Sequence, residues 1–169
     1  MYTVPRGESI AMPQDYATTC WLTCYQMMFK WRGINPNADG IKKALEGAGI
    51  AMFNVEGNGA CETGLKAKQY PQAHGSIGLR ALKGGPLDMT ELEYLLEKSG
   101  PIWCTMRYGG YNHNVVIIGA GEDRVRWIDP YWEQGSPKAP TIKSNTLKAF
   151  NNELKRFDGW KGSNACWPW

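Results

Sequence analysis

The stretch Gln14-Asp-Tyr-Ala-Thr-Thr-Cys20-Trp21, with the apolar run that follows it to Trp31, decides the fold predicted for this chain. A short polar segment gives way at Cys20 to residues that are apolar all round a 3.6-residue period. Such a period indicates a helix that is buried on most of its sides. We therefore expect a central helix over Cys20–Trp31, around which the other elements pack.

Cys20 is predicted to lie in the first turn of this helix, because Thr18 or Thr19 is suited to the N-cap position. Unpaired N–H groups and the positive end of the helix dipole favour a thiolate there, and the thiolate is the nucleophilic form of cysteine. A buried cysteine with a purely structural role is the alternative, and it would be favoured if no other residues pointed to chemistry.

The composition is typical of a soluble globular protein. The chain has 169 residues, of which 43% are hydrophobic and 21% are charged, so we expect a single domain over residues 1–169. The net charge is only +3 and the basic residues are scattered, which gives no sign of nucleic-acid binding. No stretch has the length of a transmembrane helix, and residues 1–16 lack the apolar segment of a secretory signal. Synthesis in the cytoplasm without a signal peptide is the expectation.

Five cysteines at uneven spacing do not predict a disulfide framework, so we expect reduced thiols. A zinc site is also disfavoured. Cys20 and Cys24 would share one helix face, but the chain has only two histidines and no second ligand pair at the usual spacing. We therefore predict neither a metal nor a cofactor.

Helices are predicted mainly in the first half of the chain and antiparallel strands in the second, which is the pattern of an α+β fold. Residues 1–13 are expected to be extended, and residues 50–86 to form a glycine-rich loop region with His74 at its surface. Helices are predicted over Cys20–Trp31, Pro36–Leu45, Glu62–Gln69 and Asp88–Lys98, the last of which begins with a capping box.

The second half of the chain has a different residue pattern, with short apolar or alternating segments between turns. Strands are predicted over Ile102–Met106, His113–Ile118, Arg124–Ile128 and, more briefly, Thr141–Ile142. Ser144 is expected to cap a last helix through Leu147, Phe150 and Leu154, and the tail Gly162–Trp169 to be irregular.

Three polar residues stand out by these predicted positions. Cys20 begins the buried helix, His113 begins the most apolar strand, and Asp129 ends the next strand before Pro130. If the two strands are antiparallel neighbours, His113 and Asp129 lie side by side, as a base held by a carboxylate does. The alternatives are a core histidine at 113 and an ordinary turn-starting aspartate at 129.

The ordered set of motifs resembles the papain-like cysteine peptidases. Cys20 followed by Trp21, with Gln14 six residues earlier, and then His113 and Asp129, carries the resemblance. Within that group the chain is similar to the bacteriocin-processing (double-glycine) peptidases and to related single-domain bacterial effector proteases. The further similar segments are Gly100–Trp103, Gly109–Gly119 and Val125–Pro130.

The resemblance implies a helical half packed on a C-terminal antiparallel sheet, and it implies a role for each site residue. Cys20 is the nucleophile, His113 the general base and acid, and Asp129 the group that holds the imidazole. The side-chain amide of Gln14 and the backbone N–H of Cys20 form the oxyanion hole, and Trp21 packs under the site. Cys24 would be a rival nucleophile, but it lacks the neighbouring tryptophan and the glutamine spacing.

The function implied by the resemblance is cleavage of protein substrates through an acyl-enzyme, after small residues such as Gly-Gly. We also predict use as a bacterial effector or toxin, exported by a specialised secretion system, active in the cytoplasm of a target cell and matched by an immunity protein. The same three residues would serve a deamidase, a transglutaminase-like enzyme or a cell-wall amidase. A non-catalytic binding domain is the remaining alternative.

Overall fold

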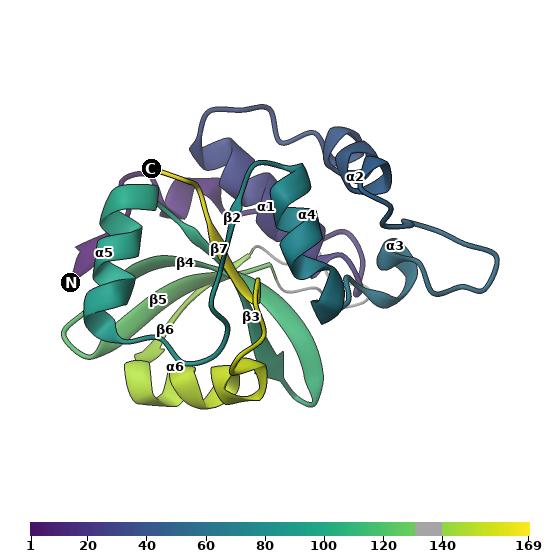
Figure 1. Ribbon diagram of the computed structural model, residues 1–169. Helices are drawn as coiled ribbons and strands as arrows, with labels where there is room; N and C mark the ends of the chain where they lie inside the picture. Colours follow the sequence, from purple (N-terminus) through teal and green to yellow (C-terminus); the bar gives the residue numbers. More distant parts are fainter. Residues whose placement is uncertain (131–139) are drawn as a thin grey trace.

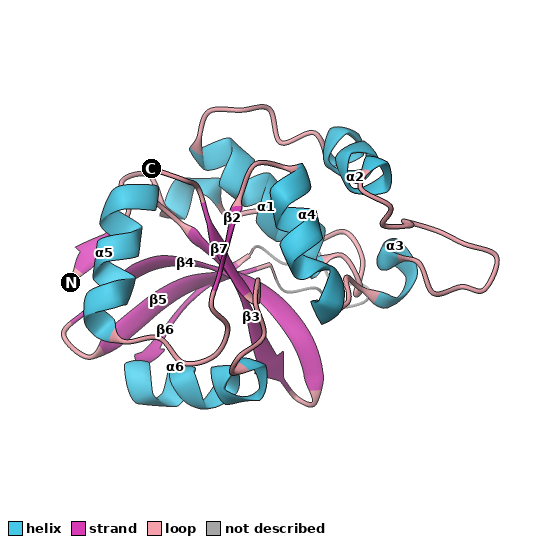
Figure 2. Ribbon diagram, in the orientation of Figure 1, coloured by secondary structure: helices cyan, strands magenta, loops and turns pink. Residues whose placement is uncertain are grey.

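The computed structural model describes residues 1–130 and 140–169, which form one antiparallel β-sheet with helices on both faces (Figures 1 and 2). The strand order is β2-β7-β3-β4-β5-β6, and β1 pairs with β4 beside this path. The predicted α+β fold is confirmed. Among the described residues, no helix is both long and apolar enough to cross a membrane.

The strands fall into a long central group and a short outer group. The long strands are β3 (Ile102–Tyr108), β4 (Tyr111–Gly121), β5 (Arg124–Asp129) and β6 (Thr141–Thr146). The short strands are β1 (Tyr2–Thr3), β2 (Arg80–Leu82) and β7 (Asn164–Cys166). The strands predicted in the second half are therefore present, and all four extend beyond the predicted bounds.

Most helices lie in the first half of the chain. They are α1 (Cys20–Trp31), α2 (Ala38–Gly47), α3 (Ala60–Thr63), α4 (Tyr70–Ser76), α5 (Met89–Ser99) and α6 (Leu147–Leu154), with 3-10 turns η1 (Glu8–Ile10), η2 (Ala67–Gln69) and η3 (Lys155–Phe157). The predicted helix over Glu62–Gln69 was wrong. Gly64, with a φ of +86°, ends α3, and η2 begins only at Ala67.

The predicted N-cap of α1 is confirmed in position, since Thr19 is the N-cap residue, although its hydroxyl donates to the carbonyl of Tyr16 at 3.0 Å and makes no capping bond. The predicted cap of α6 needs correction. Ser144 lies within β6, and the hydroxyl of Thr146 caps α6 by accepting from the backbone N–H of Ala149. The cap of α5 is as predicted, since Asp88 accepts from the backbone N–H of Glu91 at 2.7 Å.

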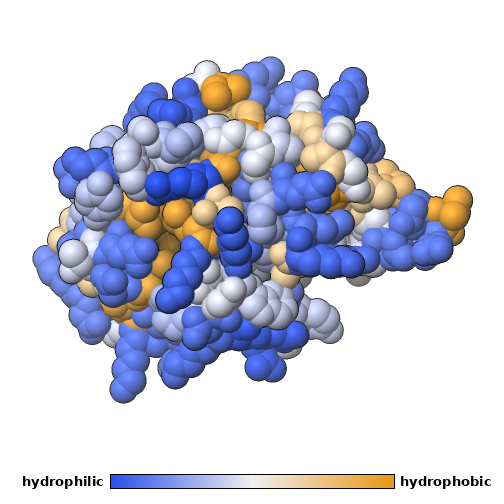
Figure 3. Space-filling model, in the orientation of Figure 1, coloured by the Kyte–Doolittle hydropathy of each residue, from blue (hydrophilic) through white to orange (hydrophobic). Residues whose placement is uncertain are grey.

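The two faces of the sheet are covered by different helices (Figure 1). Alternate residues of the central strands build two cores, because successive side chains of a strand point to opposite faces. Val116 and Ile118 pack with α1, whereas Val115 and Ile117 pack with residues of α5 and α6. On the face seen in Figure 3, hydrophilic residues cover most of the surface, and hydrophobic residues gather in the hollow between α5 and α6.

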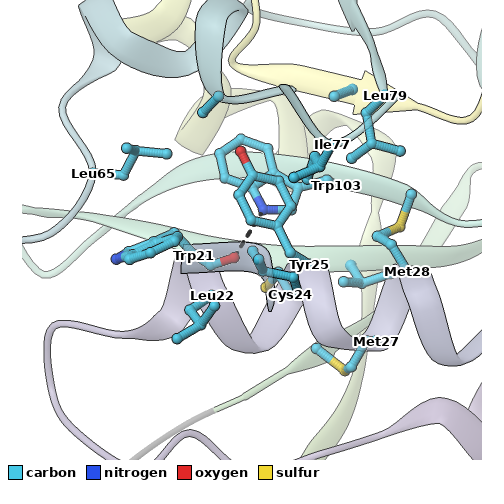
Figure 4. Packing of buried hydrophobic residues seen from close by; sticks show 14 of the residues in the cluster. Trp21, Leu22, Cys24, Tyr25, Met27, Met28, Leu65, Ile77, Leu79 and Trp103 are labelled. Carbon is cyan, nitrogen blue, oxygen red and sulfur yellow. Dashed lines mark hydrogen bonds between the residues drawn. The ribbon is translucent and has the colours of Figure 1, made fainter. Parts of the chain in front are cut away.

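Helix α1 is tied to the sheet by aromatic residues as well as by aliphatic contacts (Figure 4). The ring of Tyr25 stacks on that of Trp103 with centroids 5.5 Å apart. The indole N–H of Trp103 donates to the carbonyl of Trp21 at 3.3 Å, so the first turn of α1 is bonded directly to β3. All three rings are completely buried, and this fixes where α1 begins relative to the strands.

The tail was predicted to be irregular, and this was wrong. Asn164–Cys166 form β7, which lies between β2 and β3 and pairs with both. Ala165 and Cys166 are fully buried there, and the carboxamide of Asn164 donates to the carbonyl of Lys83 at 3.1 Å. A strand of only three residues is too short for a periodic pattern, and neighbouring strands supply its bonds.

His74 was expected on a surface loop, but it is fully buried in α4. Its Nε2 lies 2.6 Å from the carbonyl oxygen of Gly162, and its Nδ1 lies 3.0 Å from the hydroxyl of Tyr25. The carbonyl only accepts, so Nε2 donates to it and Nδ1 accepts from the tyrosine. Burial lowers the pKa of His74 from 6.5 to about 4, although the bond to Gly162 acts in the opposite direction.

This buried histidine makes the fold sensitive to acid. Between about pH 6.5 and pH 4 the unfolded chain binds a proton at position 74 and the folded chain does not, so stability falls as the pH falls through this window. The full effect is on the order of 3 kcal/mol. We expect His74→Gln to lose this share of the pH dependence, as measured by urea unfolding at pH 7 and pH 4.5. An equal acid-induced loss in the variant and the natural protein would contradict the assignment.

Candidate active site

Cys20 is the first residue of α1 and lies in a cleft of about 400 Å³. Residues 63–66 and residues 110–112 also line this cleft, so it opens between the loop after α3 and the β3–β4 hairpin. The Cys20 side chain is 7% exposed, and its thiol donates to the carboxamide oxygen of Asn114 with an Sγ–Oδ1 distance of 3.4 Å. Cys20 is therefore largely buried, but it forms part of the wall of the cleft.

His113 and Asp129 are neighbours, as the strand pairing predicted. The β4–β5 register places Val116 opposite Ile128, so the beginning of β4 lies beside the end of β5. The His113 Nε2 is 2.6 Å from Asp129 Oδ1, and the aspartate side chain is only 2% exposed. Because a carboxylate only accepts, Nε2 donates, and Nδ1 is the ring nitrogen that remains for a further partner.

Cys20 also interacts with the imidazole of His113. Burial of the ring lowers the pKa of His113, but the hydrogen bond to Asp129, the nearby Cys20 thiol and the charges of both residues outweigh it and raise the pKa to about 9. His113 therefore carries a proton at neutral pH. The structure thus brings together Cys20, His113 and Asp129, which lie far apart in the sequence, and it couples their charges.

The Asp129 carboxylate has a second cationic partner that the sequence analysis missed. Lys143 Nζ lies 2.6 Å from Asp129 Oδ2 and 5.1 Å from the ring centre of Tyr108. Burial raises the pKa of Asp129, but the hydrogen bonds and charges of His113 and Lys143 outweigh it, and the pKa lies below its usual value. The predicted strand Thr141–Ile142 stopped one residue short of Lys143, so its alternation did not place this lysine beside Asp129.

Asn114 is a second residue that the sequence analysis missed. It is 4% exposed, its Oδ1 accepts from Cys20, and its Nδ2 donates to the hydroxyl of Thr105 at 2.8 Å. Thr105 is its partner in the β3–β4 ladder. The signal was a carboxamide directly before the apolar run 115–118, because a buried polar side chain needs partners.

Gln14 is held beside the end of β5, because its backbone N–H donates to the carbonyl of Pro130 at 2.9 Å. Its Nε2 donates to the carbonyl of Tyr16 at 2.8 Å, which uses one of the two amide hydrogens. Its Oε1 is buried and has no partner among the described residues. The amide is therefore near the site but is held by its own loop.

Trp21 and Cys24 are both fully buried on α1. Trp21 is fully buried next to Cys20, and its indole N–H donates to the carbonyl of Ala60 at 3.2 Å. Cys24 is fully buried on α1, and burial, together with the charge of Cys20, raises the pKa of its thiol well above the ordinary value. A buried thiol of this kind is chemically inert. In the described part of the chain, no three His, Cys, Asp or Glu side chains could together hold a metal ion.

Comparisons with known proteins find a matching family model and a similar solved structure. The family model described as papain-like cysteine protease AvrRpt2 matches residues 2–155. The fold is similar to the crystal structure of the peptidase domain of Streptococcus ComA, a bifunctional ABC transporter involved in a quorum-sensing pathway. The TM-score is 0.56 at 16% identity, over 93% of this chain and 95% of that one. A search of curated proteins finds no match.

The two histidines should titrate far apart. We expect the His113 ring to lose its proton near pH 9 and the His74 ring near pH 4, as measured by side-chain NMR over pH 3.5–10. Asp129→Asn should lower the His113 midpoint, because the neutral amide stabilises the imidazolium less than the carboxylate does. His74→Gln removes the other resonance and assigns the two. A His113 midpoint near 6.5 that Asp129→Asn leaves unchanged would contradict the coupling.

Proposed function

The chain belongs to the family of papain-like cysteine proteases described by AvrRpt2 and is a cysteine peptidase, and we propose that Cys20, His113 and Asp129 carry out its reaction. The observation that supports this most strongly is the imidazole of His113, which bonds to Asp129 through Nε2 and interacts with the Cys20 thiol. A thiolate paired with an imidazolium is the form in which such a cysteine reacts.

The proposed reaction has two halves. The Cys20 thiolate attacks the carbonyl carbon of the scissile peptide, whose oxygen takes up the negative charge. When the C–N bond breaks, the His113 imidazolium gives its proton to the leaving amine, and a thioester remains on Cys20. His113, now neutral, takes a proton from a water molecule that attacks the thioester. The C–S bond then breaks, the product leaves as a carboxylic acid that loses its proton to the solvent, and the thiolate–imidazolium pair is restored. Asp129 holds Nε2–H throughout, so that the other ring nitrogen exchanges the proton.

We propose that the backbone N–H of Cys20 and the side-chain amide of Gln14 stabilise the developing oxyanion. The first N–H groups of a helix have no partner within it, and Cys20 is the first residue of α1. Gln14 has one amide hydrogen besides the one that it donates to Tyr16. Donors that are fixed before the reaction stabilise a transition state without having to reorganise.

For the substrate, we propose proteins cut after small residues such as Gly-Gly. The resemblance to the double-glycine peptidases supports this. So do Gly64 and Gly110, which lie in the cleft lining on the two sides of Cys20 and present no side chain to a bound peptide. We further propose a bacterial effector or toxin that a specialised secretion system exports into a target cell. A cognate immunity protein would cover the cleft in the producing cell.

Replacement of two cysteines one helical turn apart tests the choice of nucleophile. Cys20→Ala should abolish cleavage, because no other described cysteine both lines the cleft and interacts with His113. The substitution should leave the melting temperature nearly unchanged. Cys24→Ala is the matched control and should keep its activity with a modest loss of stability. Activity that survives in Cys20→Ala and disappears in Cys24→Ala would reverse the assignment. Kinetics with a labelled peptide pool and thermal unfolding measure both effects.

The oxyanion role makes a separate prediction. Gln14→Ala should lower kcat by a factor on the order of 10²–10³ with little effect on KM, because the lost bond forms mainly in the transition state. Gln14→Glu has nearly the same shape but places a charge that repels the oxyanion, so it should be at least as slow. An unchanged kcat in both variants would show that Gln14 only shapes its loop.

The reaction type can be read from the products. We expect mass spectrometry of a bacterial proteome treated with the protein to find new N-termini that follow small residues, and to find none with Cys20→Ala. Conversion of glutamine to glutamate without cleavage would instead support the deamidase alternative, which shares the acyl-enzyme.

A further inference from the structure

The carboxylate of Asp129 is held from two sides by side chains of neighbouring strands. Its Oδ1 bonds to His113 from β4, and its Oδ2 bonds to Lys143 from β6, each at 2.6 Å. The β5–β6 register pairs Asp129 with Thr141, so Lys143, two residues further on, is a diagonal neighbour on the same face of the sheet. Both oxygens are therefore fixed, and the carboxylate cannot turn about its axis without breaking an ion pair.

Burial makes the second ion pair different from an ordinary surface contact. The Asp129 side chain is 2% exposed, whereas that of Lys143 is 31% exposed and reaches Asp129 from the solvent side. A buried charge loses its hydration and needs partners within the protein. Lys143 also lies over the ring of Tyr108, which in turn lies 5.7 Å from the ring of His113. The lysine and the histidine are thus parts of one cluster around the carboxylate.

We propose that Lys143 is a positioning residue for the reaction: it fixes and keeps ionised the Asp129 carboxylate that orients His113. The proposal rests on the proposed function of Cys20, His113 and Asp129. Lys143 touches no reacting atom, so its effect passes through Asp129. With Lys143 in place, a more acidic solution is needed to protonate the carboxylate, and the imidazolium keeps its partner over a wider pH range.

Within residues 1–130 and 140–169, no other group near Asp129 replaces this contact. The pKa of Asp129 is lowered by His113 and Lys143, while burial acts in the opposite direction. On the α1 side, the charge of Asp129 contributes to the raised pKa of the Cys24 thiol. On the α6 side, Arg107 and Glu153 both line the cavity beside Trp127, and the ion pairs of Asp129 with described residues are those with His113 and Lys143.

The test is the pH dependence of Cys20 reactivity in two variants of Lys143. Lys143→Met keeps the length of the stem and removes the charge, whereas Lys143→Arg keeps a cation with N–H donors. Alkylation of Cys20 by iodoacetamide, quantified by mass spectrometry from about pH 3 to pH 9, needs no substrate, and kcat/KM on a cleaved peptide is followed over the same range. Lys42→Met is the matched control, because its side chain is 30% exposed and it pairs with Asp39 on α2.

We expect the acid limb of both profiles to move up by about one pH unit in Lys143→Met, because an opposite charge at this distance lowers a carboxyl pKa by that order. The ratio of natural to variant rates should then grow about tenfold from the neutral plateau to the acid side. Lys143→Arg should restore the profile, and Lys42→Met should leave it unchanged.

A Lys143→Met variant with an unchanged acid limb would overturn the proposal, even if its melting temperature falls, because a purely structural lysine would give that result. Failure of the proposed function looks different. In that case His113→Ala would leave the alkylation profile of Cys20 unchanged, and cleavage would persist in Cys20→Ala.

Discussion

One buried carboxylate, that of Asp129, constrains how the strands of this sheet can pair. Asp129 is almost completely buried, and it remains charged because His113 and Lys143 each bond to one of its oxygens. Taking a carboxylate out of water costs several kcal/mol unless partners of good geometry compensate it. The two partners come from the strands on either side of β5, so the register of three strands has to be correct at once. The beginning of β4, the end of β5 and the middle of β6 are thereby held together.

Helix α1 supplies the cysteine of the candidate site, whereas the sheet supplies the histidine and the aspartate. Cys20 stands at the first position of α1, and the depth of that position is set by the packing of Trp21, Tyr25 and Trp103. Burial of these large rings contributes on the order of several kcal/mol, and truncating one of them would let the helix shift. A shift of the helix along the sheet would separate the sulfur from the imidazole, so the aromatic core and the candidate site depend on each other. His74 belongs to the same core, where it links α1 to the loop before β7.

The sequence predicted those parts of the molecule that have a strong local pattern. The bounds of α1, the cap of α5, the strands β3 to β5 and the adjacency of His113 and Asp129 followed from periodicity, turn residues and antiparallel pairing. The missed features depend on contacts between distant segments. His74 is buried because Tyr25 and Gly162 satisfy its nitrogens, and β7 exists because two neighbouring strands bond to it. Lys143 and Asn114 become visible only when the register places them beside Asp129 and Cys20.

The central claim is that the Cys20 sulfur, the His113 imidazole and the Asp129 carboxylate act as one unit where the start of α1 meets the sheet. A crystal structure of the protein treated with a peptide aldehyde tests it directly. We predict a hemithioacetal on Cys20, with the His113 ring within hydrogen-bond distance of the adduct, the bonds of Asp129 to His113 and Lys143 retained, and the former aldehyde oxygen facing Gln14. An adduct on another cysteine, or one on Cys20 with the His113 ring turned away from it and beyond hydrogen-bond distance, would contradict the claim.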